Sequence, residues 1–142
     1  MSTAKFFAEA ESALAGVGVG LIETPRFRRA LERRGSRLLE RVFTPDEGAY
    51  GLRKKNGEHN FAARFAAKCA GRRVLAGLLL APVSLRDLEV VRRRSGEPTL
   101  VLRGPAAADL EARGLGFRIS LTHDADFAMA TVFLEAVRAA SA

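Results

Sequence analysis

The residue types best suited to catalysis in this sequence are one thiol, Cys69, and an imidazole followed by a carboxylate, His123 and Asp124. Two basic residues lie close to the thiol in sequence, Lys68 beside it and Arg73 one helical turn later. Positive neighbours stabilise a thiolate, and a cysteine that faces a histidine can act as a nucleophile with its base. Two alternatives stay open: a packing role for Cys69 and a solvated turn position for His123.

Arginines dominate the charged residues and give the chain of 142 residues a formal net charge of +7. Seven arginines and two glutamates fall between positions 26 and 41. A basic surface can attract an acidic protein, a phosphorylated small molecule, nucleic acid or anionic lipid. Tryptophan is absent and no aromatic residue alternates with the basic ones, so we expect no nucleic-acid partner. The arginine run is either a docking face for an acidic protein or an ordinary solvated helix surface.

Length and cysteine usage restrict the class of protein. The chain suits one domain, and a single cysteine excludes an internal disulfide and a four-cysteine zinc site. No apolar run reaches the roughly 18 residues that a membrane span requires. Glu9 and Glu11 interrupt the N-terminal stretch where a signal peptide would be apolar. We therefore expect a cytoplasmic protein with no membrane partner.

The hydrophobic periodicity predicts an α+β fold in which an antiparallel sheet packs against one long helix. The expected strands are 15–22, 85–91, 98–102, 117–121 and 127–134, and the expected later helices are 60–77 and 104–114. Earlier helices should follow Thr24, as an N-cap, and Thr44, where Glu47 would complete a capping box. The polar stretch 51–59 predicts a mobile loop. We expect one domain over 15–138, with a helical extension over 1–14 and a tail over 139–142.

Four short segments occur in the order and at the spacing of one enzyme family. Residues 16–23 read Gly-Val-Gly-Val-Gly-Leu-Ile-Glu, residues 64–70 read Arg-Phe-Ala-Ala-Lys-Cys-Ala, and residues 120–123 read Ser-Leu-Thr-His. Gly96-Glu97-Pro98 stands between the last two segments. Together they resemble the holo-acyl-carrier-protein synthases, which are 4′-phosphopantetheinyl transferases, over about residues 15–135. The resemblance implies the fold of that family.

The resemblance also implies an activity, partners and site residues. Members of the family transfer the 4′-phosphopantetheine arm of coenzyme A to a serine of an acyl carrier protein. They are homotrimers with active sites between subunits. The catalytic candidates remain Cys69, His123 and Asp124. The residues expected to bind substrate phosphates are Lys68, Arg73 and Arg64. The residues expected to dock the carrier protein are Arg26, Arg29 and Arg33.

The two carboxylates with which the family holds magnesium fall on Gly20 and Cys69. Magnesium takes oxygen ligands, whereas glycine supplies no side-chain ligand and a thiol is a poor substitute. Glu23 of the family motif is retained. The sequence therefore predicts no metal site and no magnesium, with coenzyme A or phosphopantetheine as the candidate ligand.

We expect a divergent family member that binds an acyl carrier protein and acts on a carrier-bound acyl or polyketide chain. Its role would lie in fatty acid or polyketide biosynthesis, with magnesium-dependent transfer lost or reduced. Two alternatives stay open, a working holo-acyl-carrier-protein synthase and a non-catalytic carrier-binding subunit.

Overall fold

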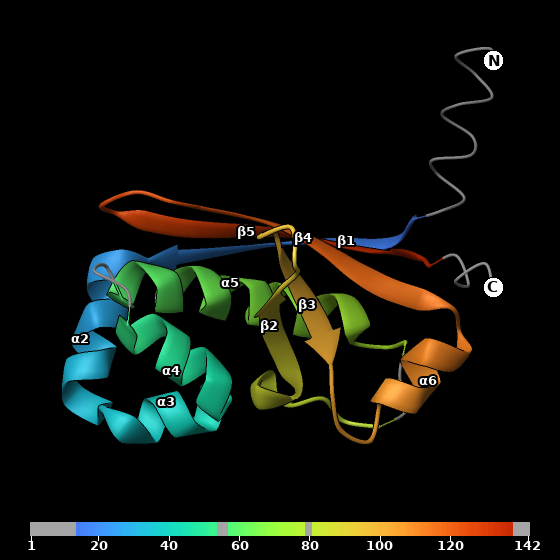
Figure 1. The fold of residues 1–142 in the computed structure, drawn as a ribbon, viewed down its shortest axis with the longest axis horizontal. Coiled ribbons are helices and arrows are strands. Elements are labelled where there is room, and N and C mark those ends of the chain that lie inside the picture. The colour runs from blue at the N-terminus through green and yellow to red at the C-terminus, as the bar shows by residue number, and fades with distance from the viewer. Residues whose placement is uncertain (1–13, 54–56, 79–80, 138–142) are drawn as a thin grey trace, which may run out of the picture.

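The computed structural model describes residues 14–53, 57–78 and 81–137, which form the α+β arrangement in Figure 1. The elements in chain order are β1 (Leu14–Glu23), α2 (Thr24–Arg34), α3 (Ser36–Val42), α4 (Pro45–Arg53), α5 (Gly57–Leu75), a short 3₁₀ helix (Leu85–Asp87), β2 (Leu88–Arg92), β3 (Pro98–Leu102), α6 (Ala107–Ala112), β4 (Leu115–His123) and β5 (Phe127–Ala136). Within these ranges, no helix has both the length and the apolar character that crossing a membrane requires. The expected N-terminal extension, apart from Leu14, and the expected tail lie outside the described residues.

The strands form two antiparallel sheets rather than the single sheet that we expected. The larger sheet has the order β1-β5-β4, and β2 pairs with β3 in the smaller one. The register of the larger sheet places Gly20 opposite Ala130, which in turn lies opposite Leu121. Figure 1 shows the helices on one side of the larger sheet, with α5 running directly beneath it. Among the described residues, no helix covers the other side of this sheet.

Small residues allow α5 to approach the larger sheet closely. Ala66 and Ala70 of α5 are fully buried, and they face the glycines of β1. The main core also contains buried aliphatic residues from both sheets, and a second cluster forms where Phe27, Phe43 and Phe61 meet below the sheet. The expected long helix and its role in the core are thus confirmed, with bounds at 57–75.

The start of α2 differs from the expectation. The N-cap is Glu23, and Thr24 is already the first helical residue. Strand β1 continues into α2 without a loop, so the capping position falls on the last residue of the strand. The Thr24 hydroxyl is fully buried, and no hydrogen-bond partner for it occurs among the described residues. The N-cap role predicted for Thr24 is therefore wrong.

The capping box at the start of α4 is confirmed. The Thr44 amide donates to Glu47 Oε1 over 3.0 Å, and the Glu47 amide donates to Thr44 Oγ1 over 3.3 Å. The loop predicted for 51–59 is wrong where the structure describes it, since α4 extends to Arg53 and α5 begins at Gly57. The loop was predicted from the polarity of residues 51–59, but polarity alone does not exclude a helix.

Candidate functional site

Two of the three residues expected to bind phosphate are buried among α4, α5 and β2. The Lys68 side chain has no exposed surface and its ammonium forms an ion pair with Glu47. The second oxygen of Glu47 accepts a hydrogen bond of 2.9 Å from the Val90 amide. Arg64, which is 4% exposed, donates to the Val90 carbonyl over 3.2 Å. A phosphate could reach Lys68 only if this ion pair separated. In the structure the Lys68 side chain instead links α5 to α4 through Glu47.

Cys69 lies on the side of α5 that faces the free edge of β1. Arg73, one turn later, donates to the Val19 carbonyl over 2.7 Å, which places this side of the helix beside that strand. The thiol is half-buried. Burial raises its pKa, and the guanidinium groups of Arg72 and Arg73 offset only part of the shift. The thiol is therefore mainly protonated at neutral pH, which favours the packing alternative over a ready nucleophile.

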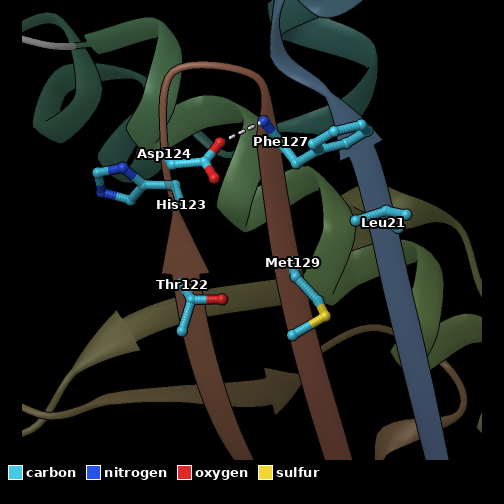
Figure 2. A pocket seen from close by; sticks show the side chains of 6 residues that line it. All are labelled: Leu21, Thr122, His123, Asp124, Phe127 and Met129. Carbon is cyan, nitrogen blue, oxygen red and sulfur yellow. Dashed lines mark hydrogen bonds between the residues drawn. The ribbon is translucent and has the colours of Figure 1, made fainter.

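His123 is the last residue of β4 and Asp124 follows it, beside a cavity of about 310 Å³ on the sheet surface (Figure 2). Asp124 Oδ1 accepts the amides of Asp126 and Phe127, both over 2.8 Å, and so holds the turn between β4 and β5. The His123 ring points away from Leu21, as Figure 2 shows. The carboxylate of Asp124 thus has a structural task in this turn.

The structure does not bring Cys69 and His123 together within one chain. Cys69 lies near the free edge of β1, His123 is on β4, and β5 separates these two strands. Two interstrand spacings amount to roughly 10 Å. A nucleophile and base pair formed by these side chains would therefore need a second chain.

The two residues that the resemblance places at metal positions, Gly20 and Cys69, do not fit magnesium. Gly20 offers no side-chain ligand, and the Cys69 thiol is mainly protonated and soft. Glu23 is exposed and occupies the N-cap position of α2, where its side chain forms no capping hydrogen bond. In the part of the chain that the structure describes, no group of three or more potential ligands from His, Cys, Asp and Glu is placed to hold a metal ion.

An apolar groove edged by arginines lies between α2 and the end of β1. Its volume is about 530 Å³, and Arg26, Arg33 and Arg34 border it together with Glu23. The floor contains three aromatic side chains, Phe27, Phe65 and Phe127, of which the first two have ring centroids 5.5 Å apart.

Two of the three expected docking arginines, Arg26 and Arg33, border this groove, whereas Arg29 lies on α2 outside the described lining. Sequence reasoning missed Arg34 as a groove residue. The spacing i, i+7, i+8 from Arg26 could have indicated it, because these positions share one helix face.

The raised pKa of Cys69 predicts slow alkylation. A pKa above that of a free thiol leaves less thiolate at pH 7, and the thiolate is the reacting species. We expect iodoacetamide to modify Cys69 at pH 7 more slowly than it modifies free cysteine. The rate should keep rising at pH values where free cysteine has levelled off. Mass spectrometry of intact protein over a pH series measures this, and a rate that equals or exceeds that of free cysteine would restore the activated-thiol interpretation.

Comparisons with known proteins agree with the fold and with the family that the motifs resemble. The family model described as the 4′-phosphopantetheinyl transferase superfamily matches residues 16–132. A holo-[acyl-carrier-protein] synthase of Solibacter usitatus is 42% identical over 123 residues, which cover 86% of this chain and 98% of the relative. That of Syntrophotalea carbinolica is 43% identical, with coverages of 86% and 96%.

Solved structures give the same result. The holo-[acyl-carrier-protein] synthase of Neisseria meningitidis superposes with a TM-score of 0.75 at 26% identity, covering 86% of this chain and 98% of that chain. The ACPS–CoA complex of Chronobacterium ammoniagenes has a TM-score of 0.71 at 31% identity, with coverages of 86% and 97%. The expected fold is confirmed, and the chain belongs to the 4′-phosphopantetheinyl transferase superfamily.

Proposed function

We propose that this chain recognises an acyl carrier protein and coenzyme A, and that it transfers the phosphopantetheine arm slowly. One observation carries the proposal: a chain that matches the family from residue 16 to residue 132 has glycine and cysteine where the metal carboxylates are expected. Phosphoryl transfer needs charge stabilisation on the phosphates, which a bound metal would supply. The remaining residues of this chain can bind and orient the two substrates. The cytoplasmic location expected from the sequence stays part of the proposal.

The arginine-edged groove supports recognition of the carrier protein. Arg26 and Arg33 offer exposed positive charge beside an apolar floor, which suits an acidic surface that also presents apolar side chains. Coenzyme A is supported by the solved neighbour that is a CoA complex. Arg73 is exposed next to Cys69 and remains the candidate for contact with its phosphates.

A working synthase is the second candidate function. Relatives at 42% and 43% identity carry the name holo-[acyl-carrier-protein] synthase, which favours transfer of the arm over our expectation of action on an acyl or polyketide chain. That expectation gains no support from these relatives, so it is not part of the proposal. A non-catalytic carrier-binding subunit would be the limiting case of very slow transfer.

A mass-shift assay decides between these functions. The purified chain is incubated with coenzyme A, magnesium and apo acyl carrier protein, with the Solibacter usitatus relative as the positive control. We expect the carrier to gain the mass of the arm at least about 100-fold more slowly than with the relative, since a lost metal site costs several kcal/mol. Binding of the carrier by calorimetry should persist. A rate equal to that of the relative would establish the working synthase, and absence of carrier binding would refute both.

We further propose that the chain assembles as a homotrimer through the uncovered side of the larger sheet. Val17, Val19 and Leu21 of β1 and Phe127 and Met129 of β5 are 40–60% exposed, although all are apolar. They alternate with the residues that face α5, so they share the outer surface. An exposed apolar surface of this kind indicates an interface.

Light scattering tests the assembly directly. We expect three times the chain mass for the unaltered protein and a shift toward the monomer for the double variant Val17→Lys and Leu21→Lys, because two buried ammonium groups would lack partners. Glu97→Lys in the exposed turn after β2 is the control and should keep the trimer. A monomer before any substitution would contradict the proposal.

A further inference from the structure

The glycines of β1 are the points at which this strand meets α5. Gly16, Gly18 and Gly20 alternate along the strand and all face the helix. A Cβ atom placed on Gly20 would overlap the Ala66 carbonyl oxygen and would lie 2.9 Å from the carbonyl carbon. Both separations are far below van der Waals contact, so the strand and helix touch here through their backbones.

The obstruction at Gly20 differs in kind from that at Gly16. A Cβ on Gly16 would meet Val74 Cγ1 at 2.8 Å, with its next neighbour at 4.0 Å, and a side chain can rotate or be shortened. At Gly20 the obstructing atoms belong to the backbone of Ala66, in the middle of α5. A mid-helix carbonyl is held by its hydrogen bond to the amide four residues later, so it cannot move without the helix. Any side chain at position 20 therefore requires α5 to shift.

At position 69 the obstacle to a metal site is charge rather than a backbone contact. Arg73 lies one turn after Cys69 on α5 and donates to the Val19 carbonyl over 2.7 Å, and together with Arg72 it opposes the rise of the thiol pKa that burial causes. A glutamate introduced at this position would gain these two cations as neighbours. Its carboxylate would pair with them in place of a metal ion.

We infer that α5 and β1 have closed over the former metal position, so that Gly20 is a packing residue and the paired substitutions Gly20→Asp and Cys69→Glu do not regenerate a metal site. The inference rests on the proposed assignment of positions 20 and 69 as the former metal positions. It adds to the proposed function that the change is fixed in the backbone, so that no metal ion at this position helps to hold the substrate phosphates.

The packing half of the inference is tested by thermal unfolding of four alanine variants, three at glycines and one at Val74. Gly20→Ala should lower Tm by about 5 °C or more, because the backbone must separate. Gly48→Ala in α4 is the matched control, since its Cβ would meet no atom of the described residues within 4 Å, and it should leave Tm unchanged or raise it. Gly16→Ala should also lower Tm. Val74→Ala should relieve that loss in a double-mutant cycle, but should not relieve the loss from Gly20→Ala.

The metal half is tested with Mn²⁺ alone, whose free concentration is read by electron paramagnetic resonance. The double variant Gly20→Asp and Cys69→Glu should bind no more Mn²⁺ than the unaltered chain. Saturable binding of one ion per chain, with Tm retained, would overturn the inference. Should the double variant fail to fold, Gly20→Ala decides, because an unchanged Tm in that variant refutes the backbone closure. Fast transfer by the unaltered chain would instead refute the proposed function, so the two failures are distinguishable.

Discussion

Replacing Lys68 with methionine should lower the free energy of unfolding by about 3–5 kcal/mol, because it leaves the Glu47 carboxylate buried without its cation. Both side chains are fully inaccessible to solvent. Burial lowers the pKa of the Lys68 ammonium while Glu47 opposes the shift, so the charged form depends on this partner. The ammonium also lies 5.2 Å from the centre of the Phe43 ring. Urea unfolding followed by circular dichroism measures the loss.

A double variant separates the loss of the pair from the loss of packing. Glu47→Gln combined with Lys68→Met removes both charges and keeps an amide oxygen for the Val90 amide, so most of the stability should return. Arg103→Met is the control. It breaks the pair between Arg103 and Glu89, in which the arginine side chain is 58% exposed, and should cost no more than about 1 kcal/mol. If Lys68→Met lowered the free energy of unfolding by less than about 1 kcal/mol, this result would contradict the structural role of the buried ion pair.

Lys68 also shows what local sequence patterns can and cannot predict. Its place one residue before a site position made phosphate binding a reasonable hypothesis. The capping box predicted the link between Thr44 and Glu47 correctly, because capping depends on neighbours three residues apart. The partner of Lys68 lies 21 residues away, and no local spacing could indicate that pairing. The order of the family motifs predicted the fold, whereas the ion pair depends on how α4 meets α5.

Asp124 and Gly20 illustrate two further limits. The Asp-x-Asp-Phe sequence from Asp124 to Phe127 is typical of a turn in which the first carboxylate accepts nearby amides, and that signal was available. The histidine beside Asp124 also permits a catalytic interpretation, and the residue types alone do not decide between the two. For Gly20 the sequence indicated the missing ligand, but the close approach of the Ala66 carbonyl, which leaves no room for a Cβ atom, depends on the position of α5. Distances between elements are set by packing, and sequence patterns record packing only indirectly.

Reversing two arginines at the groove, Arg26→Glu with Arg33→Glu, should weaken binding of apo acyl carrier protein about 10- to 100-fold. Both side chains are exposed and border the apolar floor, so an acidic partner would meet repulsion where it now meets attraction. The loss should shrink as salt rises, because exposed charges are screened. Fluorescence anisotropy of labelled carrier protein, titrated at two ionic strengths, measures both effects.

The matched control for this prediction is Arg93→Glu with Arg94→Glu, in the exposed turn between β2 and β3. It changes the net charge by the same amount but leaves the groove intact. If the groove is the docking site, this control should weaken binding only a few-fold, through the weaker overall attraction. Arg29 lies on α2 but outside the described lining of the groove, so Arg29→Glu should weaken carrier binding by an amount between those of the two double variants. Equal losses in both double variants would mean that total charge, rather than the groove, governs the encounter.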